Sequence, residues 1–215
     1  MSGIGNQIRA VLWDMDGTLV DSEPLHELSF VHAFADCGID VPDGFHSAVV
    51  GRAEAENYEW IRQRTGLRLG YDEWRKLRYR HYLKLIGDLQ PVKESFRLWR
   101  SNEQRGIVQA IVSNSDRMLM DANLAATGLA RPGMVTVTRN DVVKGKPDPE
   151  PYLRAAMLLD IPPQEIAVVE DSSSGVRAGV GAGMATYYLP VLLDNPCAEA
   201  RPFAELVSLL GEAEA

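Results

Sequence analysis

Two carboxylates one residue apart follow a short apolar run near the start of the chain. Residues 10–13 (Ala-Val-Leu-Trp) precede Asp14 and Asp16, and Gly17 then lets the backbone turn sharply. Such a run is typical of a buried parallel strand, whose carboxyl end lies at the ligand-binding edge of a doubly wound sheet. One acid at that edge can be a nucleophile and the other can transfer protons, provided that a cation keeps the first ionised. The fragment alone also fits an Asp-Gly turn between a strand and a helix.

Three further loops carry groups suited to a phosphate or a metal, and each follows its own apolar, strand-like run. The first begins with Ser113 and Asn114, where a hydroxyl and backbone N–H groups precede a helix and can bind phosphate. The second holds Lys146 in a proline-containing loop, and its ammonium is a compact charge for a phosphate oxygen. The third begins with the acidic pair Glu170 and Asp171.

The charges of these loops predict a metal ion. Asp14, Asp16, Glu170 and Asp171 would place four carboxylates against one lysine, Lys146, which requires a divalent cation or raised pKa values. Mg²⁺ prefers oxygen ligands, keeps some of its waters and bridges protein carboxylates to substrate phosphate. The residues themselves therefore indicate metal-assisted phosphoryl transfer to an aspartate.

These four motifs, in this order and over nearly the whole chain, resemble those of the haloacid dehalogenase superfamily. Within it, the chain looks most similar to the small-sugar phosphatases and the β-phosphoglucomutase-like members. The resemblance implies that Asp14 is the nucleophile that becomes an aspartyl phosphate and that Asp16 is the general acid and base. It implies a Mg²⁺-dependent phosphatase acting on a small phosphorylated metabolite, with a sugar phosphate as the expected substrate.

The same resemblance assigns the remaining motif residues. Ser113 and Lys146 match the groups that hold the phosphoryl oxygens, and the N–H groups of Met15, Asp16 and Asn114 would face the transferring phosphoryl group. The implied ligands of the Mg²⁺ are a side-chain oxygen of Asp14, the main-chain carbonyl of Asp16, and the acidic pair Glu170 and Asp171.

The pattern of elements predicts an α/β fold, a three-layer Rossmann-like core with a parallel sheet and an inserted helical cap. We expect residues 1–20 and 91–215 to form the core and residues 21–90 to form the cap, with helices beginning near Glu23, Arg52 and Tyr71. Strands and helices alternate after Pro91, which gives a parallel sheet. The expected core helices are 93–105, 116–127, 149–160, 174–182 and one after Pro202, and the expected strands are 108–112, 134–138, 166–169 and 185–189.

Three cap residues bear on the choice between phosphatase and mutase. His26 lies at the distance from Asp14 where β-phosphoglucomutase-like proteins carry a histidine that faces the active-site cleft. Those mutases also have an arginine three residues after a cap glycine, whereas here Arg52 follows Gly51 directly and Glu54 takes the third place. An acidic residue there cannot hold a second phosphate, which favours a phosphatase. A phosphosugar mutase remains the alternative within the family.

Other chemistries are less compatible with the motifs. Haloacid dehalogenases proper and phosphonate-cleaving relatives lack an acid at the place of Asp16. A non-catalytic regulatory or binding relative is an alternative of another class, but such proteins usually lose a nucleophile or a metal ligand. Four basic residues of one expected cap helix, Arg75, Lys76, Arg78 and Arg80, are interpreted as a solvated helix face.

Composition limits the partners. The chain of 215 residues has a formal net charge of −8 and no basic run, which disfavours a nucleic-acid surface. It has no apolar run long enough to span a membrane and no signal-peptide pattern at its start. Cys37 and Cys197 are far apart and fit ordinary thiols of a reducing compartment. We expect a monomeric cytoplasmic enzyme with a small phosphate ester as its substrate.

Overall fold

The computed structural model describes residues 8–49, 54–190 and 197–211. The chain divides into two compact units, which we describe one at a time. The first, the core, comprises Met1–Asp21 and Pro91–Ala215, and the second, the helical unit, comprises Ser22–Gln90. Among the described residues, no helix combines the length and the apolar character that crossing a membrane demands.

A parallel sheet forms the centre of the core, with its six strands in the order β5-β4-β1-β6-β7-β8. The strands are β1 (Ala10–Trp13), β4 (Val108–Val112), β5 (Thr136–Val137), β6 (Ile166–Glu170), β7 (Ala185–Tyr188) and β8 (Arg201–Pro202). Every residue of β1 is buried, because this strand pairs with β4 on one side and β6 on the other. Its apolar composition suits that central place. The α/β fold with a parallel sheet is confirmed.

The strand register brings the polar motifs to one edge of the sheet. Trp13, the last residue of β1, lies opposite Ile111 of β4 and Val169 of β6. The residues that follow each of these positions are therefore at the same carboxyl edge, where ligands bind in open parallel sheets.

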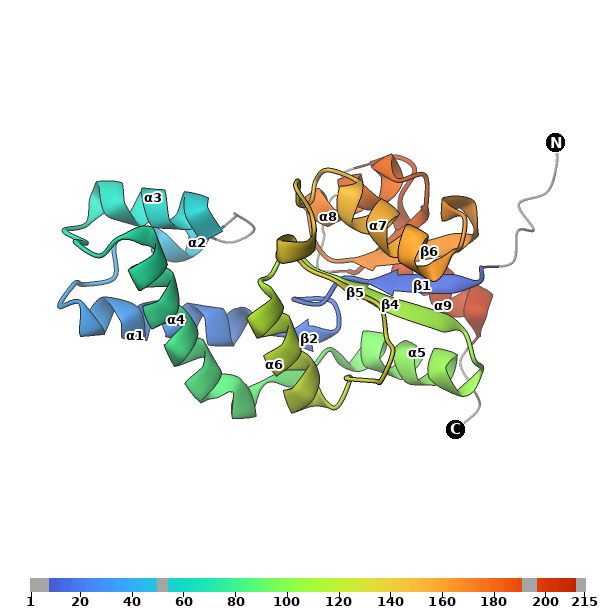
Figure 1. The fold of residues 1–215 in the computed structure, drawn as a ribbon, viewed down its shortest axis with the longest axis horizontal. Helices are drawn as coiled ribbons and strands as arrows, with labels where there is room; N and C mark the ends of the chain where they lie inside the picture. Colours follow the sequence, from blue (N-terminus) through green and yellow to red (C-terminus); the bar gives the residue numbers. More distant parts are fainter. Residues whose placement is uncertain (1–7, 50–53, 191–196, 212–215) are drawn as a thin grey trace. The chain divides into compact units, whose positions relative to one another are not determined.

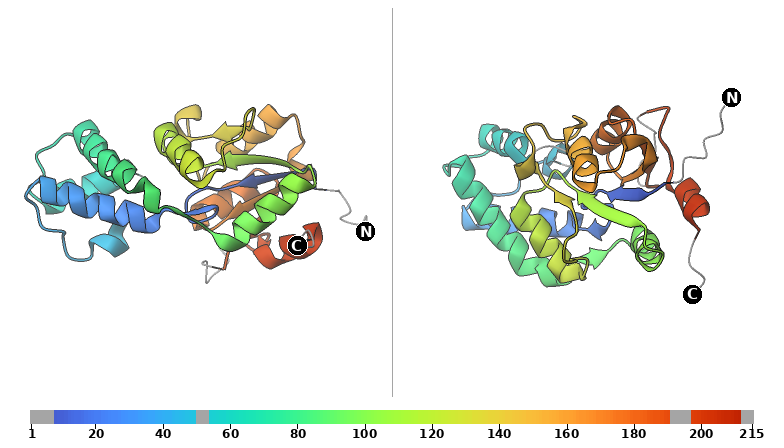
Figure 2. Two further views of the ribbon diagram at one scale, coloured as in Figure 1. Left: turned by 90° about the horizontal axis from the view of Figure 1, so that it is seen from below. Right: turned by 45° about the vertical axis from the view of Figure 1, so that its right-hand side comes forward.

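Helices cover both faces of this sheet. Figures 1 and 2 show α7 and α8 on one face and α5 on the other. The core helices are α5 (Lys93–Gln104), α6 (Arg117–Thr127), α7 (Glu150–Leu159), α8 (Ser173–Gly181) and α9 (Phe203–Leu210), with short 3₁₀ turns η2 (Arg139–Asp141) and η3 (Pro163–Glu165). Local sequence sets their ends. Ser172 caps α8 by accepting a hydrogen bond from the Gly175 N–H, and Gly128 ends α6 in the left-handed conformation at φ 65°.

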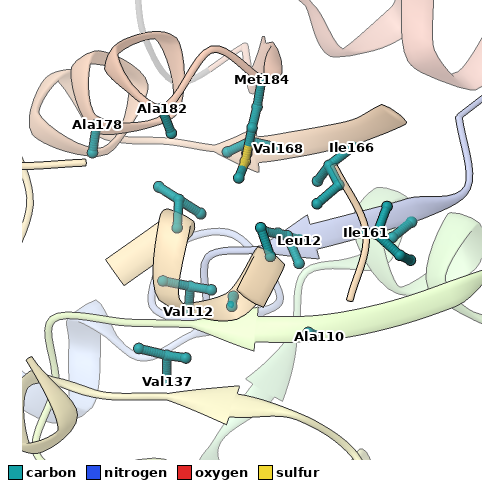
Figure 3. Packing of buried hydrophobic residues seen from close by; sticks show 14 residues of the cluster. Leu12, Ala110, Val112, Val137, Ile161, Ile166, Val168, Ala178, Ala182 and Met184 are labelled. Carbon is teal, nitrogen blue, oxygen red and sulfur yellow. The ribbon is translucent and has the colours of Figure 1, made fainter. Parts of the chain in front are cut away.

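Small and branched apolar side chains fill the layer between the sheet and the helices α7 and α8. Figure 3 shows Leu12, Val112 and Val168 of three adjacent strands together with Ala178 of α8 in this cluster. All four side chains are buried, and the alanine lets the helix approach the sheet closely. This packing fixes the strand ends that carry the polar motifs.

The helical unit contains α1 (Glu23–Asp36), α2 (Phe45–Val49), α3 (Glu54–Arg64), α4 (Tyr71–Leu85) and the 3₁₀ turn η1 (Ile86–Asp88). Aromatic side chains form its interior, where Phe34 lies between Phe45 and Trp74 with ring centroids 5.2 Å from each. The helix expected near Arg52 is described from Glu54 onward, and Arg52 itself lies outside the described residues.

Several short elements were not anticipated. They are α2 and the strands β2 (Val20–Asp21), β3 (Gln90–Pro91) and β8, of which β2 and β3 form a separate two-stranded sheet. The strand expected over 134–138 is shorter than predicted, because β5 pairs with β4 only over Thr136 and Val137. The strands β2, β3 and β8 have two residues each, which is too short for the sequence to show a periodicity.

Candidate active site

Lys146 lies at the centre of the buried charges at the sheet edge. Its Nζ donates hydrogen bonds to Asp14 Oδ1 at 2.5 Å, to Glu170 Oε1 at 2.6 Å and to the Val112 carbonyl at 2.7 Å. Asp14 is 7% exposed and Glu170 is fully buried. One ammonium thus joins the end of β1 to the end of β6, and the predicted nucleophile has a cation beside it.

The acidic residues crowd one another. Side-chain oxygens of Asp14, Glu170 and Asp171 lie within 4.8 Å of one another. Burial, and then the charge of Glu170, raises the pKa of Asp14 well above its ordinary value and raises the pKa of Asp171 to about 7. Burial alone would lower the pKa of Lys146, but the adjacent carboxylates more than offset this effect and raise it. A single lysine therefore does not balance the negative charge of the cluster.

This imbalance fits a divalent cation. The donor set of Asp14, Glu170 and Asp171 consists of carboxylate oxygens, which are the ligands that Mg²⁺ prefers. An added charge of +2 would lower the raised pKa values of Asp14 and Asp171 and so favour the ionised form of both. Asp171 is also oriented by Thr18, whose hydroxyl donates to its Oδ1 at 3.0 Å.

Asp16 points to a different set of partners from those of Asp14. Its Oδ2 accepts hydrogen bonds from the hydroxyls of Ser115 at 2.7 Å and Ser113 at 3.2 Å, and its Oδ1 accepts one from the Asn123 amide at 3.3 Å. The side chains of the two aspartates are thus held separately, as expected if they do different chemistry. Ser115 and Asn123 were not foreseen as site residues.

The loop that carries Lys146 is held by Asn114. The Asn114 side chain accepts a hydrogen bond from the Lys146 N–H at 2.9 Å and donates one to the Lys146 carbonyl at 3.1 Å. The Asn114 side chain therefore positions the lysine loop, whereas the phosphate-binding role that we predicted belongs to its main-chain N–H. Ser113 also has structural bonds, because its hydroxyl accepts from the Ser115 N–H at 2.9 Å.

Two further residues hold Glu170. The Tyr152 hydroxyl donates to Glu170 Oε1 at 2.6 Å, and the Ser172 hydroxyl donates to Glu170 Oε2 at 3.0 Å. Ser172 directly follows the acidic pair, so its proximity could be read from the sequence. Tyr152 lies six residues after Lys146 on α7, and only the packed helix brings it to Glu170.

Two of the three residues predicted for the cap, His26 and Glu54, contact Arg78 inside the helical unit. Glu54 accepts hydrogen bonds from two of the three guanidinium nitrogens of Arg78, at 2.9 and 2.6 Å, and the third lies 3.2 Å from His26 Nδ1. Arg78 is 3% exposed, so the expectation that it belongs to a solvated basic face is wrong. The reason is its cross-helix pairing with Glu54, which compensates the buried charge. Arg52 is outside the described residues.

Known proteins share this architecture. The chain is 27% identical over 185 residues to a phosphorylated carbohydrates phosphatase of Thermotoga maritima. This alignment covers 84% of each protein. It is 29% identical over 186 residues, or 83% of its length, to the chloroplastic protein SUPPRESSOR OF QUENCHING 1 of Arabidopsis thaliana, and spans 17% of that protein. The crystal structure of CbbY from Rhodobacter sphaeroides in complex with phosphate has the same fold, with a TM-score of 0.81 and 24% identity over 93% of this chain and 96% of that one.

A family model gives the assignment. The model of the haloacid dehalogenase-like hydrolases matches residues 8–183, which include all four polar motifs. The resemblance that the motifs suggested is thus confirmed, and this chain belongs to the haloacid dehalogenase-like hydrolase family.

Proposed function

We propose that this hydrolase is a Mg²⁺-dependent phosphatase that cleaves a small phosphate ester, with a sugar phosphate as the preferred class, through an aspartyl phosphate on Asp14. The observation that carries the proposal is the contact of one buried lysine with two acids from different strands, Asp14 and Glu170. The charge of this lysine favours the ionised form of Asp14, which is the form that acts as a nucleophile, and offers charge to a phosphoryl group.

In the first step, an oxygen of the Asp14 carboxylate attacks the phosphorus of the ester. The bond between phosphorus and the leaving-group oxygen breaks, and Asp16, which is protonated at this stage, gives its proton to that oxygen. The alcohol leaves as a neutral molecule, and the phosphoryl group stays on Asp14. Lys146 offsets the charge of the phosphoryl oxygens.

In the second step, water releases the phosphate. Asp16, now ionised, takes a proton from a water molecule, and the water oxygen attacks the phosphorus of the aspartyl phosphate. The bond between phosphorus and the Asp14 oxygen breaks, so that inorganic phosphate leaves and the Asp14 carboxylate is restored. Ser115 and Asn123 hold the Asp16 side chain during both proton transfers.

The metal would be held by side-chain oxygens of Asp14, Glu170 and Asp171, and by the main-chain carbonyl of Asp16. When bound, Mg²⁺ supplies positive charge that stabilises the transferring phosphoryl group. The fit of the donor set and the raised pKa values of Asp14 and Asp171 support its presence.

The substrate class is supported by the relatives. The match to a phosphorylated carbohydrates phosphatase favours a sugar phosphate. We further propose that residues 21–90 act as the cap that selects the leaving group, with His26 as the residue to test first. A His26→Ala variant should change which substrates are preferred while phosphoryl transfer to Asp14 continues.

A screen of phosphate release tests this function. Sugar phosphates, phosphoglycolate and nucleotides are supplied with Mg²⁺, and the same reactions are run with excess EDTA. We expect release from at least one sugar phosphate that stops with EDTA. Full turnover in EDTA would contradict the metal requirement, and an isomerised sugar phosphate with little free phosphate would indicate a mutase.

The nucleophile is tested by Asp14→Asn. The amide cannot form an acyl phosphate, so turnover should be lost while the circular dichroism spectrum stays that of the wild type. Lys146→Ala should also reduce turnover severely, because the phosphoryl group loses its fixed cation. Turnover by Asp14→Asn in a preparation free of wild-type enzyme would overturn the assignment.

A further inference from the structure

The phenol of Tyr152 contacts two members of the charged cluster at once. Its hydroxyl donates to Glu170 Oε1 at 2.6 Å, and the Lys146 Nζ lies 4.9 Å from the centroid of its ring. The side chain is fully buried. A tyrosine in this place offers a hydrogen-bond donor to the acid and a π face to the ammonium.

The same glutamate oxygen receives both donors. Glu170 Oε1 accepts from the Lys146 ammonium at 2.6 Å as well as from the phenol, while Ser172 occupies Oε2. Two donors on one oxygen share its negative charge, so each is attracted less strongly than a single donor would be. The phenol therefore limits how far Glu170 draws the lysine away from Asp14.

The phenol is suited to act as a fixed donor. A tyrosine hydroxyl, whose ordinary pKa is about 10, keeps its proton at neutral pH and can donate it to Glu170 Oε1. The start of α7 is also tied to the loop that carries the lysine, because the Glu150 carboxylate accepts hydrogen bonds from the N–H groups of Val143 and Lys144, each at 2.8 Å. The contact between α7 and this loop therefore holds the Tyr152 ring beside the Lys146 ammonium.

We propose that Tyr152 is a positioning residue that holds the Lys146 ammonium midway between Asp14 and Glu170. In the part that concerns turnover, this inference rests on the proposed function. In the part that concerns geometry, it stands on the contacts alone, and the two parts can be tested separately.

The geometric test uses Tyr152→Phe, which keeps the ring and removes only the donor. NMR of ¹⁵N-lysine-labelled protein reports the side-chain ammonium of Lys146, and its resonance is assigned by its loss in Lys146→Arg. We expect this resonance to shift in Tyr152→Phe, because Glu170 Oε1 then attracts the ammonium more strongly. The matched control is Tyr187→Phe, another buried tyrosine of the core, which should leave the resonance in place. An unchanged resonance in Tyr152→Phe would overturn the proposal.

A measurement on the wild-type protein covers the case in which the variant does not fold. The nuclear Overhauser effect between the Lys146 ammonium and the ring protons of Tyr152 should be observable, since the group and the ring are in contact. Its absence would contradict the arrangement.

The kinetic test separates positioning from a merely structural role. Tyr152→Phe should lower kcat by about tenfold with KM nearly unchanged, as loss of an outer partner of a charged site commonly does. Tyr187→Phe should change neither constant. Equal kcat in Tyr152→Phe and the wild type would overturn the role in turnover. If the wild-type enzyme cleaves no ester at all, the proposed function fails, and the NMR comparison still decides whether Tyr152 positions the lysine.

Discussion

The Ser115 hydroxyl donates a hydrogen bond of 2.7 Å to Oδ2 of Asp16, the shorter of the two serine contacts to that oxygen. Ser115 stands two residues after Ser113 at the end of β4, whereas Asp16 follows β1. The bond therefore holds Asp16, the proposed proton donor after β1, by a residue of the loop that follows the neighbouring strand β4.

Removing this hydroxyl should disturb proton transfer more than phosphoryl binding. Ser115→Ala is expected to lower kcat for alkyl phosphates by about tenfold, a fraction of what general acid catalysis usually contributes. Aryl phosphates should be affected less, because phenolates leave without a proton. Steady-state kinetics on one alkyl and one aryl ester measure the difference.

A suitable control is Ser208→Ala, since the Ser208 hydroxyl bonds only to the Ala204 carbonyl of its own helix among the contacts described. Equal losses for alkyl and aryl esters in Ser115→Ala would show that the serine does not act through Asp16.

Gly175 is predicted to be irreplaceable because α8 begins directly against Glu170. A Cβ at Gly175 would lie 1.8 Å from the Glu170 carboxyl carbon, which no side chain tolerates. Gly175→Ala must therefore displace Glu170 or the helix, at about 1–3 kcal/mol of stability. Thermal denaturation measures the loss, and phosphate release should fall with it because Glu170 leaves Lys146.

The same helix supplies the matched control. The atoms nearest to a Cβ at Gly181 would belong to Pro149, with the nearest at an ordinary contact distance of 3.7 Å. Gly181→Ala should leave stability unchanged or raise it slightly, because alanine favours a helix. If the two variants behaved alike, close packing on Glu170 would not be the reason for the glycine.

The motif-bearing loops could be predicted because each depends on local sequence. The apolar residues 10–13 and 166–169 are buried strands whose last residues face each other in the register, which places Asp14 beside Glu170. Such runs carry their own strand signal, and parallel topology then determines which ends meet. The fold and the family were therefore readable from the chain.

The supporting residues were not readable, since their roles arise from packing across elements. Tyr152 is one apolar position of a helical pattern, and nothing in that pattern specifies contact with Glu170. Arg78 was interpreted as solvated because it is one of several basic residues on its helix, and its partner Glu54, 24 residues away on another helix, gives no local signal. Local periodicity predicts which face of a helix is apolar, but it does not predict which charged residue of another helix lies against that face.

The acidic cluster predicts that the stability of the metal-free protein falls as the pH rises and that Mg²⁺ offsets this loss. The pKa of Asp171 is raised from 3.8 to about 7 in the folded protein, so the folded state binds more protons than the unfolded state between those values. Stability from this group is therefore full below about pH 4 and is lost as the pH rises through about 7. The raised pKa of Asp14 acts in the same direction.

Denaturation by urea in EDTA and in Mg²⁺ measures this effect. The gain from Mg²⁺ should be larger at about pH 8 than at about pH 5.5, because the metal replaces the protons that the acids otherwise hold. Asp171→Asn should flatten the dependence on pH in EDTA. A gain from Mg²⁺ that is the same at both pH values would count against a metal bound by these carboxylates.

The helical unit offers the clearest test of a buried charge pair. Arg78 is buried and its guanidinium is held by Glu54 through two hydrogen bonds, of 2.9 and 2.6 Å. Glu54→Gln removes the compensating charge and leaves the arginine cation buried among apolar rings such as Phe30, whose centroid is 4.5 Å away. Stability should fall by about 3 kcal/mol, the usual cost of breaking a buried pair from one side.

Glu59→Gln is the matched control on the same helix. Glu59 also pairs with an arginine, Arg62, but both side chains are about half exposed, so water screens the pair. Urea denaturation followed by circular dichroism should therefore show a large shift of the midpoint for Glu54→Gln and little for Glu59→Gln. If Glu54→Gln instead kept wild-type stability and changed only the preferred substrate, Glu54 would act on the substrate and not through Arg78.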